Sequence, residues 1–600
     1  MSGHKVNNFV LKMANVNGTG SASANGLVSK AIFRMGVPMS AKNFFPSNIQ
    51  GLPTWYEIRI SGDGYRARAG QVDVMVAMNA QTYKRDVAEV CSGGYLIYDS
   101  TWPWDEQLSR DDVTFIGVPF ARMASEAFTG SRIRILMKNV IYAGALAALL
   151  DIDMAVIKQL LKDQFGDKQH LIDANHKAIA LGYDFAKENF DCPLHCRLES
   201  DSKTDGQIVI DGNAAAALGC LYAGATVGAW YPITPSTSLM DAFAGYCNKF
   251  RSGDEGNRFM IIQAEDELAA IGMVVGASWN GARAFTPTSG PGISLMSEFI
   301  GFAYYTEIPA VLFDIQRVGP STGMPTRTQQ CDILICAYAS HGDTQHVCLY
   351  PANPEECFEM AADAFDLAER LQTPVFVVSD LDIGMNEWAC PEFTWDDARR
   401  PDRGEVLDAE QLAAIEKFHR YLDDDNDGIA ARSLPGVHPK GAYFTRGSGH
   451  NKFGGYTEDA DEYQEVLDRL KFKFNEARHR VPAAVESGAH DGEVGIIAYG
   501  SSDGAMIEAL DRLKEQGLDA AYLRIRGFPF GSEVQKFIDR HEVVFIVEQN
   551  RDAQMRTLLM NDLGVRRDDL VPLLHYSGLP IYADFIVQGV LNHLQQRKTA

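Results

Sequence analysis

A glutamate on the apolar face of a predicted helix is the first residue whose position suggests chemistry. Residues 263–276 have helical spacing and begin with acidic side chains, which favour a helix N-terminus in any case. Glu267 differs from Glu265, because its spacing places it on the apolar stripe of the helix with Ile271, Val274 and Val275. A carboxylate on a buried face is costly unless it has a partner or a task. From the residues alone, an ordinary acidic helix start and a catalytic carboxylate both remain open.

Two polar side chains lie on loops that the sequence makes rigid or places at strand ends. Thr234 lies in the segment 231–237, where two prolines fix the backbone. Arg317 follows a buried strand at 310–313, and the strand ends of a parallel sheet are its usual ligand edge. A guanidinium there can bind a carboxylate through two donors. A plain proline-braced turn and a surface salt bridge are the alternatives.

A glycine loop near the N-terminus enters a predicted helix. Residues 17–26 contain Gly18 and Gly20, and bare amides at a helix N-terminus bind phosphates. A dinucleotide fingerprint also needs a third glycine and a later acidic residue. Ser23 stands in place of that glycine, and no acidic residue follows about twenty positions on. The sequence therefore disfavours an NAD-linked dehydrogenase.

Composition and charge narrow the class of protein. The 600 residues carry a formal charge of −24, with a pI near 5.0, which argues against nucleic acids and anionic membranes as partners. We expect a cytoplasmic protein, because the sequence lacks an apolar run of roughly 18 residues. Cys192, His195 and Cys196 supply only three soft ligands, whereas structural zinc and iron–sulfur clusters need four. We therefore expect no metal on this chain.

Strand-like and helical runs alternate through most of the chain, which predicts an α/β protein with several parallel-sheet domains. In the first part the strand-like runs are 72–76 and 95–98. The expected organisation is a Rossmann-like domain, a linker, a second α/β domain, an irregular connecting region and a compact C-terminal βαβ domain, at residues 1–192, 193–207, 208–385, 386–490 and 491–600.

Four segments together resemble the alpha subunit of the 2-oxoacid:ferredoxin oxidoreductases. The resemblance spans nearly the whole chain and is closest to the 2-oxoglutarate type, in which a gamma domain is fused ahead of alpha. It implies a pyrimidine-type thiamine-diphosphate fold at 208–385 and a transketolase-like C-terminal domain, to which we assign no chemistry. The segments are YPITPST, QAEDELAAIG, TPTSGPG and IQRVGPSTGMPTRTQQCD, at 231–237, 263–272, 286–292 and 315–332.

The resemblance also implies a reaction. Glu267 matches the glutamate that contacts N1′ of thiamine diphosphate and so promotes formation of the C2 carbanion. The cofactor then acts as the electron sink in decarboxylation. Two electrons leave singly through a [4Fe–4S] cluster to ferredoxin, and coenzyme A takes the acyl group.

The same resemblance assigns substrate-binding roles. Thr234 and Arg317 would hold the 2-oxo-carboxylate, with Thr322 nearby. A second, distal carboxylate needs another cation, for which Arg327 and His341 are available in this segment and a partner chain is the other source. The resemblance associates the first domain with coenzyme A, although the loop of Gly18 and Gly20 departs from the family pattern GxGGQG.

One expected motif is missing. A diphosphate and Mg²⁺ site needs GDG with an asparagine some 25–30 residues on. Residues 62–64 read GDG, but the window 87–91 contains no asparagine, so we interpret this GDG as a turn. By resemblance, the diphosphate, Mg²⁺ and the cluster lie on a separate beta subunit, in a dimer of alpha–beta heterodimers. This chain alone should be inert.

The expected substrate is 2-oxoglutarate, which would give succinyl-CoA and CO₂. The same chemistry on pyruvate, branched-chain 2-oxoacids or indolepyruvate is the nearest alternative. A non-catalytic scaffold that binds coenzyme A is the alternative from another class.

Overall fold

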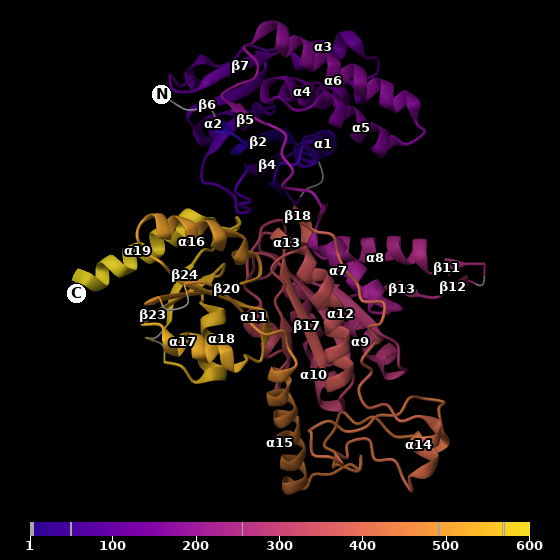
Figure 1. Ribbon diagram of the computed structural model, residues 1–600. Helices are drawn as coiled ribbons and strands as arrows, with labels where there is room; N and C mark the ends of the chain where they lie inside the picture. Colours follow the sequence, from indigo (N-terminus) through magenta and orange to yellow (C-terminus); the bar gives the residue numbers. More distant parts are fainter. Residues whose placement is uncertain are drawn as a thin grey trace.

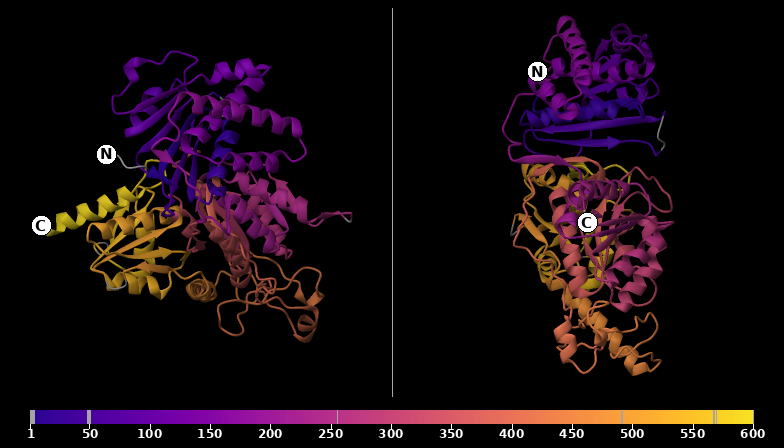
Figure 2. Two further views of the ribbon diagram at one scale, coloured as in Figure 1. Left: turned by 45° about the horizontal axis from the view of Figure 1, so that its top comes forward. Right: turned by 90° about the vertical axis from the view of Figure 1, so that its right-hand side faces the viewer.

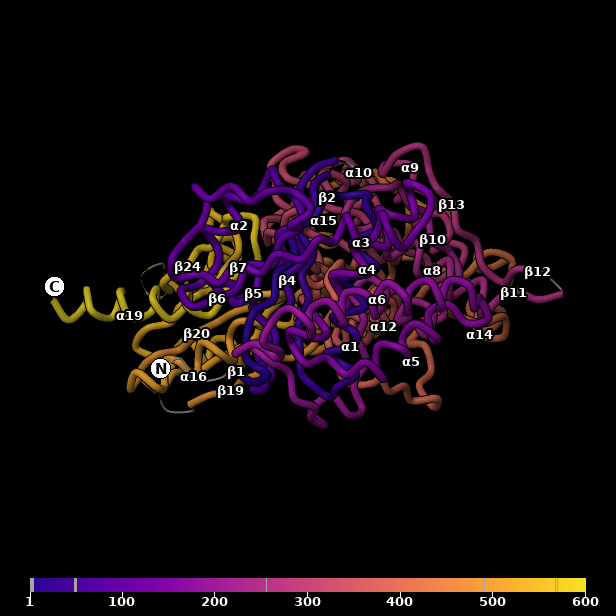
Figure 3. The backbone as a smooth tube through the Cα atoms, turned by 90° about the horizontal axis from the view of Figure 1, so that it is seen from above, coloured from indigo at the N-terminus to yellow at the C-terminus, as the bar shows by residue number. Residues whose placement is uncertain are grey.

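The structure is a computed structural model that describes residues 5–47, 51–254, 256–489, 492–566, 568 and 570–599. Within these residues, three large sheets organise the chain (Figure 1). The first lies at the top of Figure 1, the second in the centre and the third beside it on the left. Each sheet forms one unit with the helices that pack on it, and we number the units as the sheets. Figure 2 shows the first unit stacked over the second and third. Seen from above in Figure 3, the N-terminal tube overlies them.

The first sheet is half parallel and half antiparallel. From β7 to β2 the strands are parallel, as the alternation of strands and helices predicts. The strands from β4 onward pair antiparallel, because β3 and β4 are consecutive in the chain without a helical crossover between them. The order is β7 (Thr114–Val118), β6 (Val90–Asp99), β5 (Val72–Ala77), β2 (Asn8–Val16), β4 (Pro53–Ser61), β3 (Met39–Phe44), β18 (Glu387–Pro391) and β9 (Gln207–Ile210).

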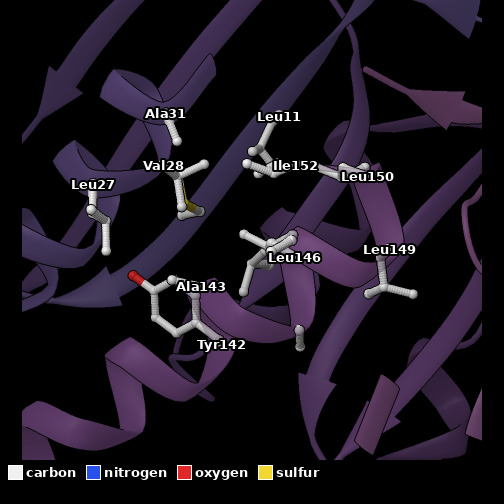
Figure 4. Close-up of a cluster of buried hydrophobic side chains, with 14 of the residues drawn as sticks. Leu11, Leu27, Val28, Ala31, Tyr142, Ala143, Leu146, Leu149, Leu150 and Ile152 are labelled. Atoms are coloured by element: carbon white, nitrogen blue, oxygen red, sulfur yellow. The ribbon is translucent and has the colours of Figure 1, made fainter. Parts of the chain in front are cut away.

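The core of this unit depends on close contact between two long helices. α4 and α6 approach so tightly that a Cβ on Gly144 would lie 2.1 Å from the Ile179 carbonyl oxygen. Figure 4 shows side chains of α4, among them Leu146, facing those of α1 and β2. The helices are α1 (Ser21–Arg34), α2 (Tyr83–Glu89), α3 (Phe120–Ala127), α4 (Ser131–Leu150), α5 (Met154–Phe165) and α6 (Gln169–Asn189).

α4 is also the one helix in the described residues long and apolar enough to cross a membrane. Its most apolar window is 72% buried inside the molecule. That burial is what the core helix of a folded domain shows.

At the edge of the first unit, β1 (Lys5–Val6) pairs in parallel with β8 (Cys196–Arg197).

The second sheet is parallel except at one edge. Its last strand, β22, comes from the C-terminal part of the chain and pairs antiparallel with β16. The order is β13 (Met260–Gln263), β10 (Val227–Trp230), β14 (Ala284–Thr288), β15 (Ala310–Gln316), β17 (Pro374–Asp380), β16 (Val347–Leu349) and β22 (Gly527–Phe528). The short strands β11 (Ser252–Gly253) and β12 (Gly256–Asn257) pair apart from it.

Helices flank this sheet and complete its core. They are α7 (Gly212–Tyr222), α8 (Thr237–Phe250), α9 (Glu267–Trp279), α10 (Gly290–Thr306), α11 (Ile333–Ala337), α12 (Pro354–Leu371) and α13 (Leu381–Met385). The strands β9 and β18, which flank this unit in sequence, belong to the first sheet. The two units are therefore joined by backbone hydrogen bonds as well as by packing.

Between β18 and β19 the described chain is largely irregular and forms the extension at the bottom of Figure 1. Its helices are α14 (Ala409–Ala414) and α15 (Ala460–Glu476). A fully buried carboxylate, Glu307, ties α15 to the C-terminal end of α10. It accepts from Lys473 at 2.7 Å and pairs with Arg469.

The third sheet is parallel apart from its first strand. It shares an apolar core with the second unit, and a polar contact adds to it, since Arg526 binds Glu356 on α12 at 2.7 Å. The strand order is β19 (Val485–Gly488), β21 (Ala521–Ile525), β20 (Val494–Tyr499), β23 (Val543–Glu548) and β24 (Leu570–Leu574). The helices are α16 (Met506–Glu515), α17 (Ser532–Arg540), α18 (Gln554–Leu563) and α19 (Ala583–Thr599).

Candidate active site

A cavity of about 910 Å³ lies where the second and third units meet. We call it the central cavity. One wall comes from the start of α10 and from the loop after β15, and the other comes from the segments that follow β23 and β24. These are carboxyl ends of parallel strands, where ligands bind in open α/β sheets. The polar and charged side chains in its lining are Ser294, Arg317, Ser321, Gln329, Cys331, Asp332, Asn550, Arg551, Asp552, Gln554 and Tyr576.

Arg317 is the buried cation of the central cavity. It follows β15 directly, and its Nη1 donates to the carbonyl oxygen of Thr234 at 2.7 Å. Its Nε has no acceptor in the described part of the chain. Burial lowers the pKa of the guanidinium, and the nearby charges of Asp332 and Glu267 oppose that shift. The structure thus brings together three of the residues predicted from the sequence: Thr234, Glu267 and Arg317.

Glu267 is the first residue of α9, and its side chain is 6% exposed. The N-cap is the preceding residue, Asp266, which accepts from the Ala269 amide at 2.7 Å. The buried face of α9 includes Glu267 with Ile271 and Val274, as the spacing predicts. Within the described residues no hydrogen bond reaches the Glu267 carboxylate. A buried carboxylate of this kind is stable only with a partner, so Glu267 is poised to receive a donor from a ligand.

Bare backbone and unused hydroxyls surround Glu267. A Cβ on Gly292 would lie 3.0 Å from Glu267 Cγ and would collide with Thr288 Oγ1, so only glycine leaves this space open. The hydroxyls of Thr286, Thr288 and Ser289 are buried without a described partner. This donor set fits the aminopyrimidine end of thiamine diphosphate, which needs one buried carboxylate and several polar contacts.

A second carboxyl group forms part of the cavity wall. Asp332 packs against Gly290, whose added Cβ would lie 2.6 Å from both carboxylate oxygens. Behind it lies Asp314, which is fully buried and accepts from the Cys336 thiol at 3.4 Å. Burial raises the pKa of Asp332, and burial together with the charge of Asp332 raises the pKa of Asp314. Two carboxyl groups held this way favour keeping a proton between them.

The C-terminal unit contributes the opposite wall. Asn550 Nδ2 donates to the Gln330 carbonyl oxygen at 3.0 Å, and Gln554 Nε2 donates to that of Cys331 at 2.7 Å. These bonds fix the segment 550–554 against the loop that carries Arg317. The sequence argument assigned no chemistry to this unit. The structure shows that part of the cavity wall belongs to it.

Of the predicted site residues, Arg317 lines the central cavity, whereas Thr234 and Glu267 are not among its lining residues and lie near Arg317. Three further predicted residues or alternatives do not line it. Thr322 is exposed on the loop after β15 and does not line the central cavity. His341, the alternative cation, is exposed and lies 3.5 Å from Glu298. Arg327 lines a different cavity, because Val318 pairs with Met324 and turns the loop back on itself. The distal-carboxylate role predicted for Arg327 therefore has no support from its position.

The second cavity, which we call the cation cavity, has a volume of about 200 Å³ where the three units meet. Two carboxylates form ion pairs with these cations in the described part of the chain: Glu57 pairs with Lys12 and Arg68, and Glu89 pairs with Lys12 and Arg85. Burial and the nearby charge of Arg85 lower the pKa of Arg327. The cavity is lined by Lys12, Phe44, Trp55, Arg68, Arg85, Met324, Arg327, Ser577 and Leu579.

The backbone conformation and packing of the loop at 17–26 explain why it contains glycines. Gly18 and Gly20 have φ values of 85° and 79°, which other residues rarely adopt. A Cβ on Gly20 would lie 2.2 Å from Leu136 Cδ2 on α4, and Asn139 donates to the Thr19 carbonyl oxygen at 2.8 Å. Neither glycine lines the central cavity or the cation cavity. The packing of α1 on α4 accounts for Gly20, and the positive φ accounts for Gly18.

Sequence reasoning passed over Cys331, Asp332, Arg551 and Tyr576. The first two stand at the end of a segment that carried the family resemblance, and that position was their only signal. Arg551 comes shortly after the end of the buried strand β23, whereas Arg317 comes directly after β15. The same strand-end rule, applied to the C-terminal unit, would have found it.

Comparisons with known proteins identify the family of the chain. The family model "Pyruvate flavodoxin/ferredoxin oxidoreductase, thiamine diP-bdg" matches residues 218–406, and "Pyruvate ferredoxin/flavodoxin oxidoreductase" matches residues 10–185. A 2-oxoglutarate synthase subunit KorA of Methanocaldococcus jannaschii is 35% identical over 56% of this chain and 86% of its own length. An alpha subunit of a 2-oxoacid:ferredoxin oxidoreductase of Aeropyrum pernix is 28% identical over 96% of each chain.

A solved structure matches nearly end to end. The 2-oxoglutarate:ferredoxin oxidoreductase from Magnetococcus marinus, with 2-oxoglutarate, coenzyme A and succinyl-CoA bound, is 26% identical. It covers 98% of this chain and 99% of its own, with a TM-score of 0.88. These findings confirm the predicted α/β fold class, the family and the oxidoreductase activity. The chain belongs to the 2-oxoacid:ferredoxin oxidoreductases and is similar to their alpha subunits along almost its whole length.

Proposed function

We propose that this chain is the alpha-type subunit of an enzyme that oxidises 2-oxoglutarate. The reaction joins 2-oxoglutarate and coenzyme A to give succinyl-CoA and CO₂, and each of two oxidised ferredoxins takes one electron. The observation that carries the proposal is that Glu267, a buried carboxylate without a described hydrogen bond, lies near enough to the buried cation Arg317 for its charge to act on the guanidinium. The choice of 2-oxoglutarate is supported by relatives named 2-oxoglutarate synthase and by the structure named for 2-oxoglutarate.

Glu267 would hold the ring end of thiamine diphosphate. When bound, that cofactor supplies a carbanion and an electron sink. Glu267 would share a proton with the ring nitrogen. Its carboxylate is suited to this role because it is buried and makes no other hydrogen bond in the described residues. The hydroxyls of Thr288 and Ser289 are available for further polar contacts. Gly292 leaves room for the ring to approach the backbone.

Arg317 would orient the 2-oxoacid. The Thr234 carbonyl oxygen occupies Nη1, which leaves the Nε and Nη2 donors for a carboxylate in the two-donor geometry that guanidinium groups favour. Because Arg317 is itself buried, its electrostatic attraction for an anion is stronger than it would be in water. The Thr234 carbonyl also fixes the plane of the guanidinium, so the carboxylate binds in one orientation.

A partner subunit would complete the site. No GDG motif followed by an asparagine occurs at the spacing expected for the diphosphate and Mg²⁺, and no four-cysteine cluster motif occurs in the sequence. We therefore assign the diphosphate, Mg²⁺ and the [4Fe–4S] cluster to a beta subunit, in a dimer of alpha–beta heterodimers that passes electrons to ferredoxin. The central cavity is open on one side, where such a subunit would cover it.

The cation cavity is our candidate for the phosphate end of coenzyme A. Four cations line it and no carboxylate is among its lining residues, in a chain of net charge −24. Gly578 separates it from the central cavity, because a Cβ there would lie 2.9 Å from Met324 Cε and 3.4 Å from Val318 Cγ2. A long ligand anchored by Arg85 and Arg327 would therefore have its reactive end next to the central cavity. We prefer this position to the loop of Gly18 and Gly20.

The test is a substrate panel on the assembled complex. The chain is produced with its beta subunit, and viologen reduction is followed with each 2-oxoacid and coenzyme A. We expect the highest kcat/KM for 2-oxoglutarate and no activity from the isolated chain. A higher kcat/KM for pyruvate, a branched-chain 2-oxoacid or indolepyruvate would retire 2-oxoglutarate as the substrate. Activity of the isolated 600-residue chain would retire the shared site.

A further inference from the structure

The central cavity contains a second cation besides Arg317. Among its described lining residues, Arg317 and Arg551 are the basic ones. They belong to opposite walls, since Arg317 follows β15 of the second unit and Arg551 follows β23 of the third. Arg327 and His341, the cations expected from the sequence, do not line this cavity. Arg551 is therefore the cation in the described lining, besides Arg317, that could bind a distal carboxylate.

The segment that carries Arg551 is held rigidly at both ends. On one side, Asn550 donates to Glu548 at 2.7 Å and to the Gln330 carbonyl oxygen at 3.0 Å. On the other side, Gln554 donates to the Cys331 carbonyl oxygen at 2.7 Å, and its Oε1 accepts from the Leu334 amide at 3.1 Å. Since both anchors bind the loop that follows Arg317, the backbone that carries Arg551 keeps a fixed position across the cavity from Arg317.

The backbone next to Arg551 is strained, as is common at ligand-binding sites. Ala553 has a φ of 51° at the start of α18, a conformation that costs a non-glycine residue about 1 kcal/mol or more. Such strain persists where surrounding contacts hold it, and it clusters at functional sites. The turn at Ala553 lets residues 551 and 552 project at the cavity while the helix behind them stays packed.

Arg551 is held loosely by its present partner. It donates to Asp552 at 2.8 Å and 3.0 Å, and the two side chains are 73% and 62% exposed. An exposed ion pair between neighbouring residues contributes little. The guanidinium is therefore free to exchange Asp552 for an incoming carboxylate, which becomes a stronger partner once the covered cavity excludes water.

We propose that Arg551 binds the distal carboxylate of a dicarboxylic 2-oxoacid whose 2-oxo-carboxylate end is held by Arg317. This role rests on the proposed function, and it makes the C-terminal unit a determinant of substrate selectivity. A monocarboxylic 2-oxoacid has no group for Arg551, which then stays paired with Asp552. The cavity would thus select its substrate by charge at the far end.

The experiment measures discrimination between two substrates of equal carbon number. 2-Oxopentanoate carries a methyl group where 2-oxoglutarate carries its distal carboxylate. With the complete complex, kcat/KM is measured for both in the wild type and in Arg551→Ala, Arg551→Lys and Arg400→Ala. Arg400 is an exposed arginine that is not among the lining residues of the central cavity, so it serves as the matched control. Thermal melting and co-purification with the beta subunit check assembly.

We expect Arg551→Ala to lower the ratio of kcat/KM for 2-oxoglutarate to that for 2-oxopentanoate roughly 10- to 100-fold. The loss should appear mainly in KM for 2-oxoglutarate, Arg551→Lys should recover part of it, and Arg400→Ala should keep the wild-type ratio. A ratio in Arg551→Ala within twofold of wild type, or an equal loss on both substrates, would overturn the role of Arg551. A wild type that prefers 2-oxopentanoate would instead refute the proposed function, which separates the two failures.

Discussion

Exchange of Glu267 for glutamine tests the central argument most directly. The substitution keeps the size of the side chain and removes its charge. Among the described residues Glu267 makes no hydrogen bond, and the α9 N-cap is Asp266, so the variant removes little that the fold needs. The favourable position of a carboxylate at a helix N-terminus contributes about 0.3–1 kcal/mol. Loss of an unpaired buried charge offsets this, so we expect a nearly unchanged melting temperature.

The effect on the reaction should be far larger. Proton transfer by a positioned side chain typically contributes about 10²- to 10⁴-fold in rate, which corresponds to about 3–5 kcal/mol in the activation barrier. We therefore expect kcat of Glu267→Gln to fall by two to four orders of magnitude, while the complex with the beta subunit still forms. Viologen reduction measures kcat, and differential scanning fluorimetry measures stability.

Glu265 provides the matched control. It lies two positions earlier, is exposed, and carries the same charge near the same helix terminus. Glu265→Gln should keep at least half of the wild-type kcat. If Glu267→Gln retained more than a tenth of wild-type kcat, or if both variants lost activity equally, the assignment of Glu267 to the cofactor ring would be wrong. An equal loss would point to helix electrostatics rather than to a specific contact.

Three further predictions concern charge. Glu307→Gln leaves Lys473 buried without its partner and should cost about 3–5 kcal/mol, seen as faster hydrogen exchange in α15; unchanged exchange would contradict it. Burial raises the pKa of Asp332 and Asp314, so the folded state keeps a proton that the unfolded chain releases, and stability falls as pH rises above the ordinary carboxyl pKa. Asp332→Asn should therefore raise the free energy of unfolding more at pH 8 than at pH 5, by on the order of 2 kcal/mol at pH 8, and an equal gain at both pH values in denaturant unfolding would refute this. Arg327→Ala should raise KM for coenzyme A about 10-fold; a rise in KM for the 2-oxoacid instead would restore its substrate role.

What the sequence predicted correctly is what short-range spacing determines. The apolar stripe Ile271, Val274 and Val275 recurs every three or four residues, so it locates the face on which Glu267 must lie, and α9 has that face buried. Arg317 follows directly from the end of a recognisable strand. Both inferences need only the local geometry of a helix or a strand.

What the sequence did not predict depends on contacts between distant segments. Arg327 is ten residues from Arg317, yet the bridge between Val318 and Met324 folds the loop so that the two side chains enter different cavities. β18 lies some 340 residues after β3 and still pairs with it. The sequence of a short strand such as β18 does not identify the strand with which it pairs, because pairing depends on the packing of the whole sheet.

Hydrogen bonds across the interface between the second and third units hold the two walls of the central cavity together. Gln330 is buried there, and its side chain donates to the Tyr499 carbonyl oxygen at 3.0 Å and accepts from Ser502 at 3.0 Å and from the Gln549 amide at 3.2 Å. Its backbone bonds with Gln549 and Asn550 as well. A buried polar network of this kind fixes one geometry, because any shift leaves several groups unpaired. Apolar packing alone would let the two walls slide by fractions of an ångström at little cost. The hydrogen bonds of Gln330 therefore help to fix the backbones of the two walls relative to each other, which is why a selective cavity can be built across a domain boundary.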